Sequence, residues 1–210
     1  MDDTPTPTCT VFLLSPAKTR GGRADVMLSQ RASFELALRL RAGDGVPIGE
    51  VFAWLSALYF RGKLAYARRF ADPPGGLPGA FVIVPGLGLR SVDEPFTAAQ
   101  LRLVGGVDAS EANEQHVVPL LRDANVLARG YPGARFVLLG SIATDKYVAP
   151  LLEAMGERLL FPSDFVGRGD MSRGGLLLRA SRAGRELAYS VVASSRRNGP
   201  RVPRLPRLPR

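Results

Sequence analysis

Short apolar runs alternate along this chain with longer stretches in which apolar residues recur at helical spacing. Three of the runs have the length and composition of buried strands: residues 10–15 (TVFLLS), 80–89 (AFVIVPGLGL) and 134–141 (ARFVLLGS). A brief, continuous apolar run bounded by turn residues is typical of a central strand whose two faces are both covered. We therefore predict three buried strands, the second of which ends in a glycine-rich turn.

The stretches between these runs have the spacing of amphipathic helices. We predict one or two helices in 24–43, two in 47–71, a short one capped by Thr97, one in 113–130 and one in 144–156. Gly62 is the expected break between the two helices of 47–71. The basic residues that follow it, including Lys63, are expected to face outward.

The C-terminal part of the chain has a different pattern. Residues 158–175 are predicted to form a short strand that enters a polar loop, because the second half of this stretch is rich in glycine and charge. Residues 176–192 are predicted to form a hairpin. Strands that alternate with helices indicate an α/β domain with a mainly parallel central sheet flanked by helices, to which this hairpin would add an antiparallel C-terminal edge.

Length and composition fit one domain with a single core. The chain has 210 residues, of which 46% are hydrophobic, and two separate domains of half this size would each be cramped. We place a flexible lead at 1–10, the α/β domain at 11–193 and a disordered basic tail at 194–210. The sequence does not indicate an oligomeric state.

Cysteine and histidine are too scarce for several kinds of site. Cys9 and His116 are single representatives of their types, which excludes an intrachain disulfide framework and argues against a zinc site. We expect neither a metal nor a cofactor, and a reducing cytoplasmic location. The longest nearly apolar run, at 51–60, is far shorter than the roughly 20 residues that span a bilayer, so no membrane insertion is expected.

Most of the positive charge lies in the tail. The formal net charge is +9, but the first 193 residues, with 22 basic and 19 acidic side chains, hold only +3 of it. The tail has no acid and six arginines, which are candidate nucleic-acid contacts: Arg196, Arg197, Arg201, Arg204, Arg207 and Arg210. Its Pro-Arg-Leu repeat favours an extended polyproline-II segment that could follow phosphates. A solvated, disordered terminus is the alternative.

Three loops follow predicted strands, and ligands of parallel sheets bind at the carboxyl ends of the strands. The first loop follows residues 10–15 and offers the Ser15 and Thr19 hydroxyls, the Lys18 ammonium and glycine-rich backbone to an anion. A plain structural turn is the alternative. The Ser-x-x-Lys spacing is that of penicillin-recognising acyl enzymes, but their further motifs are missing.

The second loop, at 84–96, contains glycines and adjacent acids. Gly86 and Gly88 would let the backbone approach a ligand closely, and Asp93 and Glu94 would supply carboxylates for hydrogen bonding or proton transfer. Neighbouring acids are also an ordinary surface feature, so both interpretations stay open.

The third loop, at 161–175, has the highest density of polar side chains. Arg168 and Arg173 suit bidentate capture of phosphate or carboxylate, and Asp164 or Asp170 could orient a base edge or activate water. An exposed glycine-rich loop with internal salt bridges is the alternative. Two weaker candidates are the residues after the third strand, including Lys146, and His116, which is expected on a helix surface.

The first two loops also resemble a known family. "LLSPAKT" (13–19) is similar to the N-terminal "ISPAKT" signature of the YaaA peroxide-stress protein family, a bacterial α/β group associated with DNA binding and protection from oxidative damage. "VIVPGLGLRSVDEPF" (82–96) is similar to a Gly-Leu-x-x-x-Asp-x-x-x-Pro-Tyr segment of that family, with Phe96 at the tyrosine position. The resemblance marks Ser15, Pro16, Lys18 and Thr19, and also Gly86, Leu89, Asp93 and Pro95.

Two more distant similarities point in the same direction. The base-modifying module of archaeosine synthase similarly opens with a strand followed by Ser and Lys, and residues 136–156 are similar, at the level of fold, to the uracil-DNA glycosylase superfamily. These resemblances imply a protein that acts on nucleic acid, more specifically DNA, with a nucleotide or extruded base held in a pocket at the strand ends.

The resulting hypotheses differ in chemistry. In the first, Lys18, Arg168 and Arg173 hold phosphate, and an acid among Asp93, Asp164 and Asp170 supports metal-free base-modifying or N-glycosidic chemistry, with Lys18 a further catalytic candidate. The second is a small-molecule enzyme acting on a nucleotide or another phosphorylated metabolite. The third is a DNA-binding protein without catalysis, which protects DNA through its arginines.

Overall fold

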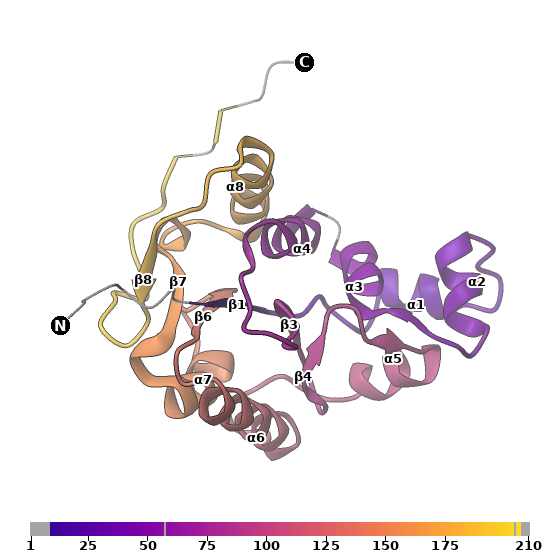
Figure 1. Cartoon of the computed structure of the whole chain (residues 1–210). Coiled ribbons are helices and arrows are strands. Elements are labelled where there is room, and N and C mark those ends of the chain that lie inside the picture. The colour runs from indigo at the N-terminus through magenta and orange to yellow at the C-terminus, as the bar shows by residue number, and fades with distance from the viewer. Residues whose placement is uncertain (1–8, 57, 204, 207–210) are drawn as a thin grey trace.

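The fold is an α/β domain built on a mainly parallel sheet, as the sequence predicted (Figure 1). The computed structural model describes residues 9–56, 58–203 and 205–206. Within them, the main sheet has the strand order β4-β3-β1-β6-β7-β8. The four inner strands run parallel and the two edge strands antiparallel: β1 (Thr10–Leu14), β3 (Ala80–Val84), β6 (Arg135–Leu139) and β7 (Leu159–Pro162), with β4 (Gly88–Ser91) and β8 (Tyr189–Val191) at the edges.

Strand β1 lies at the centre of this sheet because its side chains are apolar on both faces. It pairs in parallel with β3 on one side and β6 on the other, so that Phe12 lies beside Ala80 and Val137. All five of its residues are buried. The three predicted buried strands are therefore present, and the sheet brings their carboxyl ends to one edge.

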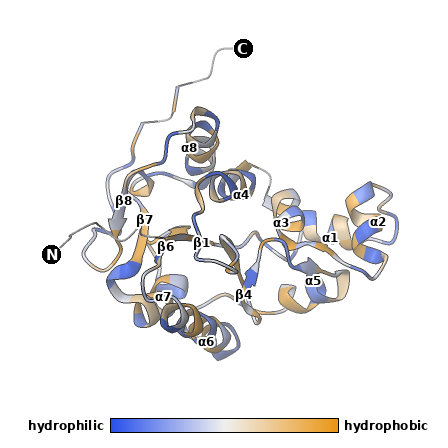
Figure 2. Cartoon of the chain, viewed as in Figure 1, coloured by the Kyte–Doolittle hydropathy of each residue, from blue (hydrophilic) through white to orange (hydrophobic). Residues whose placement is uncertain are grey.

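Helices cover both faces of the sheet. In Figure 1, α4 (Leu58–Phe70) and α8 (Asp170–Ala183) lie on one side, and α6 (Glu114–Gly130) and α7 (Asp145–Met155) on the other. The remaining elements are α1 (Arg23–Leu28), α2 (Glu35–Arg41), α3 (Ile48–Ser56), α5 (Ala98–Gly105), the short turns η1 (Gly156–Arg158) and η2 (Ser163–Phe165), and a small sheet of β2 (Val46–Pro47) with β5 (Pro95–Phe96). Figure 2 shows that the covering helices carry both hydrophobic and hydrophilic residues, as expected for helices with one face on a core.

Two helices begin with side-chain caps, and the first of these, at Thr97, was predicted. Thr97 begins α5 with a capping box, in which its side chain accepts a hydrogen bond from the Gln100 backbone and the Gln100 side chain accepts one from the Thr97 backbone. The Asn113 side chain accepts a hydrogen bond from the Gln115 backbone at the start of α6. Both bonds satisfy N–H groups that a helix start leaves without partners.

The glycines of α4 and α8 are the main departure from the predicted elements. Gly62 does not break a helix but lies inside α4. The short strand predicted after residue 158 is present as β7, but η2 and the fourteen-residue helix α8 replace the polar loop and most of the hairpin predicted after it. The expected antiparallel C-terminal edge is supplied by β8. A β-carbon on Gly62 would lie 2.6 Å from the carbonyl oxygen of Gly174, and one on Gly174 would lie 2.8 Å from the Tyr59 α-carbon. These glycines allow two helices to pack backbone against backbone.

A second departure concerns residues 80–91. The predicted single strand is a hairpin, in which β3 turns at residues 85–87 and returns as β4, with Val84 opposite Gly88. A β-carbon on Gly88 would lie 2.2 Å from the Asp123 carboxylate. That carboxylate accepts a hydrogen bond from the Leu89 backbone at 2.9 Å, so Gly88 lets the hairpin approach α6 closely.

The two ends of the chain are described only in part. Residues 1–8 of the predicted lead, and residues 204 and 207–210 of the predicted tail, lie outside the described residues. The described tail residues contact the body: the Val202 backbone donates to the Gly167 carbonyl at 3.2 Å, and Arg197 forms an ion pair with Asp145 at the start of α7. No helix of the described chain has the length and apolar character needed to cross a bilayer.

Candidate functional site

A polar cavity of about 300 Å³ lies beside the carboxyl ends of β1 and β3 and the start of α7. Its lining consists of Pro16, Ala17, Lys18, Thr19, Arg20, Pro85, Val107, Asp108, Ala109, Lys146 and Tyr147. Three of these side chains are cations and one is a carboxylate. Arg20 and Asp108 form an exposed ion pair at 3.6 Å. Asp108 is the carboxylate of the lining, so neither lysine of the lining has a lining carboxylate as its partner.

The first predicted loop forms one wall of this cavity. Lys18 is exposed, Thr19 is buried, and both line the hollow together with Pro16. Lys146 enters from the first turn of α7, where its ammonium lies 5.0 Å from the centre of the Tyr147 ring. The carboxyl edge of the sheet therefore brings together Lys18 and Lys146, which are 128 positions apart in the sequence.

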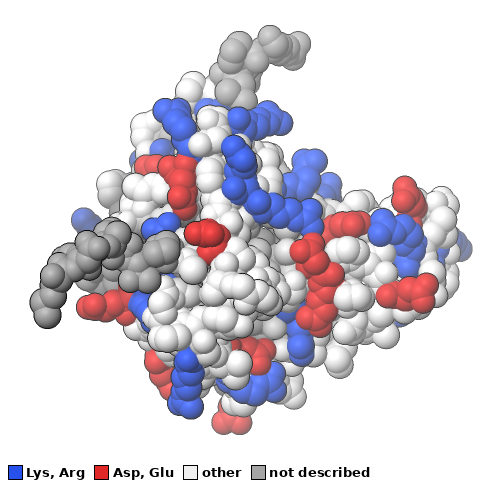
Figure 3. Space-filling model, viewed as in Figure 1, with Lys and Arg blue, Asp and Glu red and all other residues white. Residues whose placement is uncertain are grey.

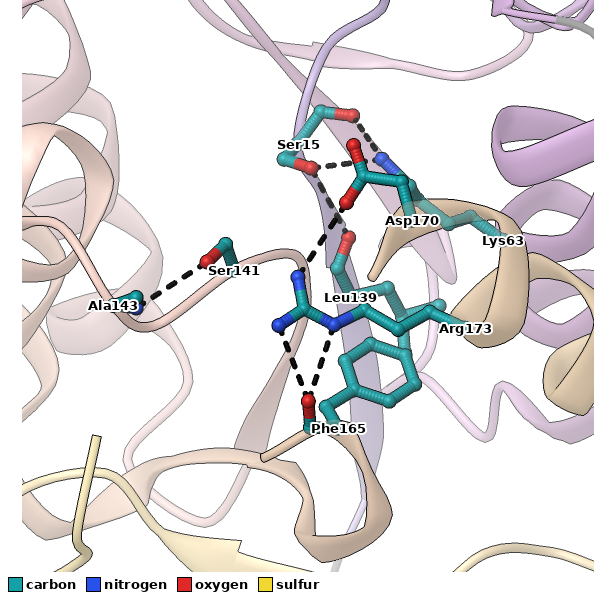
Figure 4. A network of polar contacts seen from close by, with 8 residues as sticks. All are labelled: Ser15, Lys63, Leu139, Ser141, Ala143, Phe165, Asp170 and Arg173. Carbon is teal, nitrogen blue, oxygen red and sulfur yellow. Dashed lines mark hydrogen bonds and ion pairs between the residues drawn. The ribbon is translucent and has the colours of Figure 1, made fainter. Parts of the chain in front are cut away.

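Directly behind this loop lies a buried polar cluster that centres on Lys63 of α4 (Figure 4). The Lys63 Nζ atom lies 2.7 Å from the Ser15 hydroxyl oxygen and donates to the Ser15 carbonyl at 2.8 Å. It also lies 4.0 Å from the centre of the Tyr59 ring. Only 1% of Lys63 is exposed, so its predicted outward position is wrong.

The burial of Lys63 has an electrostatic consequence. Desolvation lowers its pKa from 10.5 to about 7, with Asp170 acting to raise the pKa and Arg173 to lower it further. Near neutral pH, the Lys63 amine therefore exists in comparable amounts with and without its proton. The Tyr59 phenol beside it stays neutral because burial raises its pKa.

The start of α8 supplies the other charges of the cluster. Arg173 donates from Nε and Nη2 to the Phe165 carbonyl at 3.2 and 3.1 Å, and its Nη1 lies 3.5 Å from the Asp170 carboxylate. Arg173 is 9% exposed, whereas Asp170 is largely exposed. Figure 4 shows Lys63, Asp170 and Arg173 converging with Ser15 near the ends of β1 and β6.

The β6 end of the cluster is packed tightly. The Ser15 hydroxyl donates to the Leu139 carbonyl at 3.4 Å, and a β-carbon on Gly140 would lie 2.9 Å from the Ser15 β-carbon. Glycine at position 140 thus leaves room for Ser15. Ser15 and Arg173, both candidates from the sequence, meet here around Lys63, which sequence reasoning had not selected.

A sequence signal for Lys63 does exist. The chain has 28 basic residues, of which three are lysines, and these three are Lys18 and Lys146 in the cavity lining and Lys63 behind it. Lysine adapts its pKa to burial more readily than arginine does. All three lysines of the chain therefore lie at or directly behind this edge of the sheet.

The second predicted loop contributes Pro85 to the cavity lining, but its candidate site residues lie elsewhere. Asp93 forms an exposed ion pair with Arg68 at 2.7 Å. Gly86 lies in the β3–β4 turn and Gly88 begins β4, with φ values of 79° and 84°, and their nearest neighbours are Val107 and residues of α6. A ligand site in this loop therefore stays a prediction, and Asp93, Gly86 and Gly88 each contact other parts of the protein.

The third predicted loop is divided between two surroundings. Asp170 and Arg173 belong to the buried cluster, whereas Asp164 is exposed in η2. Arg168 donates from Nη1 to the Ser172 hydroxyl and to the Pro203 carbonyl, both at 3.3 Å. Lys18, Asp93 and Arg168 thus have three different sets of neighbours.

The tail arginines and His116 complete the candidates. Among the tail residues that the structure describes, Arg196 and Arg201 are exposed and Arg197 pairs with Asp145, while Arg204, Arg207 and Arg210 lie outside the described residues. His116 is fully buried rather than on a helix surface. Its Nε2 lies 3.1 Å from the Lys146 carbonyl, and burial lowers its pKa.

Neither a metal-binding group of side chains nor a similar protein identifies the ligand of the cavity. In the described part of the chain, no group of three or more His, Cys, Asp or Glu side chains could hold a metal ion. No family model, curated protein or solved structure matches this chain.

Proposed function

We propose that this chain binds a phosphate-bearing ligand, a nucleotide or a nucleic acid, in the cavity at the carboxyl edge of its sheet. The observation that carries the proposal is the cavity lining, in which Lys18, Arg20 and Lys146 face a single carboxylate. An excess of cations in a polar hollow favours an anionic ligand, and phosphate is the anion that lysine ammonium groups commonly bind in proteins.

The position of the cavity supports the same class of ligand. Lys146 lies in the first turn of α7, where the positive end of the helix dipole adds to its charge. The Thr19 side chain supplies a hydroxyl, which can donate to a phosphate oxygen. A volume of about 300 Å³ is at the small end of ligand pockets and suits one nucleotide unit.

Two features favour nucleic acid, and DNA in particular, over a free nucleotide. Pro16, Lys18 and Thr19, which carry the resemblance to the YaaA family, are cavity residues. Figure 3 shows basic side chains spread over α8 and the neighbouring α4, a surface that could extend contacts along a phosphate backbone. A small-molecule enzyme acting on a free nucleotide is the alternative.

The experiment compares two charge-matched variants of the full chain. Lys18→Ala/Lys146→Ala removes two cavity cations, and Arg102→Ala/Arg129→Ala removes two exposed cations from α5 and α6. Binding to end-labelled oligothymidylate and to adenosine monophosphate is measured by fluorescence anisotropy and calorimetry. We expect the lysine variant to lose roughly tenfold or more in affinity, because two charge-assisted contacts are lost, and the arginine variant to change little.

The outcomes separate the hypotheses. Equal weakening by both variants would mean general electrostatic attraction and would refute a cavity site. Binding of the mononucleotide without measurable oligonucleotide binding would select the small-molecule alternative. If replacing the exposed tail residues Arg196 and Arg201 by serine abolishes oligonucleotide binding while the cavity variant retains it, the non-catalytic tail hypothesis holds.

A further inference from the structure

The contact between Ser15 and Lys63 has the geometry of a nucleophile with its base. Their Oγ and Nζ atoms are 2.7 Å apart, and the amine is held in place from a second direction by its 2.8 Å bond to the Ser15 carbonyl. We propose that Ser15 is a nucleophile activated by Lys63 and that the chain transfers acyl groups from activated esters. A hydroxyl within hydrogen-bond reach of an oriented base is the arrangement that nucleophilic catalysis requires.

Ser15 and Lys63 differ in exposure and in their distance along the chain from the cavity wall. Ser15 is 7% exposed and Lys63 1% exposed, so both residues are buried and Ser15 keeps more accessible surface of the two. Residues 16–19, which follow Ser15 directly, line the open cavity. Ser15 is not one of the lining residues, but it is bonded directly to Pro16, which is, and Lys63 lies one contact further from the cavity.

The surroundings allow the amine to accept a proton. Lys63 faces the neutral Tyr59 ring on its own helix, and Asp170 and Arg173 on α8, whose opposite charges act on it in opposite directions. Burial favours the neutral amine. When the Ser15 hydroxyl rotates away from the Leu139 carbonyl, to which it donates at 3.4 Å, this amine can take its proton and still donate to the Ser15 carbonyl. A purely structural partner for that carbonyl would need no such titration, since an arginine could donate as well.

The proposed step is balanced by the two residues and water. The Ser15 hydroxyl proton moves to Lys63 Nζ while Oγ bonds to the acyl carbon of the ester, whose carbonyl electron pair moves to its oxygen. When that pair returns, the bond to the leaving alcohol breaks, and the Lys63 ammonium gives the alcohol its proton. Water then attacks the acyl-Ser15 ester in the same way, releasing the acid and restoring both side chains.

The start of α8 adds positive potential near this reaction. Arg173 borders the cluster with two donors on the Phe165 carbonyl, and the first turn of α8 carries the positive end of its helix dipole. Both favour negative charge that develops on an acyl oxygen. This activity is separate from phosphate binding, so each can fail without the other.

The test uses p-nitrophenyl acetate and a fluorophosphonate as probes on the full chain. Peptide mass spectrometry should find acetyl and phosphonyl adducts on Ser15, and the labelling rate should rise with pH around a midpoint of about 7, the pKa of Lys63. Ser15→Ala should remove the adducts. Lys63→Met should slow labelling by roughly a hundredfold or more, the usual contribution of a general base.

Matched variants keep the result interpretable. Ser141→Ala changes a neighbouring loop serine whose hydroxyl accepts a hydrogen bond from the Ala143 backbone, and this variant should label like the unaltered chain. If Lys63→Met does not fold, as judged by circular dichroism, the pH midpoint and Ser15→Ala decide. A folded, unaltered chain with no adduct on Ser15, or labelling that is independent of pH near 7, would overturn the proposal.

Discussion

Gly62 of α4 and Gly174 of α8 contact each other so closely that a β-carbon on Gly62 would lie 2.6 Å from the Gly174 carbonyl oxygen. Each glycine is the neighbour in sequence of a residue in the buried cluster, Lys63 in one helix and Arg173 in the other. The close crossing therefore sets how near the two charged side chains lie. Fold and candidate site depend on the same backbone contact.

This contact predicts opposite effects for two adjacent substitutions in α8. Gly174→Ala should lower the free energy of unfolding by about 1–3 kcal/mol, because the new β-carbon would press on the Tyr59 backbone. Gly175→Ala should raise it by up to about 1 kcal/mol, because alanine favours helix and its β-carbon would meet only a Leu205 methyl at 3.5 Å. Urea unfolding of both variants measures the difference.

Equal effects of the two substitutions would contradict the backbone contact. Circular dichroism at low urea should show that both variants keep the helix, since the comparison concerns packing rather than helix formation. The activity predicted for Ser15 should fall in Gly174→Ala and persist in Gly175→Ala if the crossing positions Lys63.

The central strands were predictable because their signal is local. Residues 10–14 and 135–139 are apolar at every position or nearly so, and the sheet buries them on both faces. Helix α8 was missed for the opposite reason: Gly174 and Gly175 are helix-breaking by propensity, and only the contact with Gly62 explains the first of them. Tertiary packing overrides local propensity here.

The candidate site was predictable in part. The rule for parallel sheets selected the loop after β1, and residues 16–19 do line a cavity. Lys63 was missed because a lysine in a helix is usually solvated, although it lies four positions after Tyr59 on the buried face. Asp93 was selected as a carboxylate beside glycines, and its partner Arg68 comes from a distant helix that no local pattern identifies.

Gly88 at the start of β4 and Gly76 in the loop before β3 are expected to differ in their tolerance of alanine. Gly88 and Gly76 have nearly the same positive φ, 84° and 79°, but a β-carbon on Gly76 would meet open space, and one on Gly88 would lie 2.2 Å from Asp123. Gly76→Ala should therefore cost about 1–2 kcal/mol of stability for the backbone conformation alone. Gly88→Ala should cost a further 1–3 kcal/mol or so for the lost space against α6. Equal losses in thermal unfolding would contradict the role of Gly88 in packing.

Thr97 and Thr144 both precede a helix, but we expect their replacement by alanine to have different effects on stability. Thr97 accepts a hydrogen bond from Gln100 in a capping box, whereas the Thr144 side chain makes no capping bond to α7. Thr97→Ala should lower the free energy of unfolding by about 1 kcal/mol. Thr144→Ala should change it by much less, and a loss as large as that of Thr97→Ala in urea unfolding would show that hydrogen bonding is not the cause.

Because burial lowers the pKa of Lys63, we expect the free energy of unfolding to depend on pH between about 7 and 10.5. Its pKa is 10.5 in the unfolded chain and about 7 in the folded one, so between these values the unfolded chain binds more protons than the folded chain. The free energy of unfolding must then rise with pH across this window, by up to about 1.4 kcal/mol per pH unit. Below pH 7 both states are protonated, and the full cost of burying the charge is present.

The measurement is urea unfolding at a series of pH values for the unaltered chain and for Lys63→Met, whose other titrating groups are the same. The difference between the two should climb from pH 7 toward 10.5 and be constant below 7, whereas a difference that is flat across the window would show that Lys63 keeps its proton in the folded state, which would also remove it as a base for Ser15.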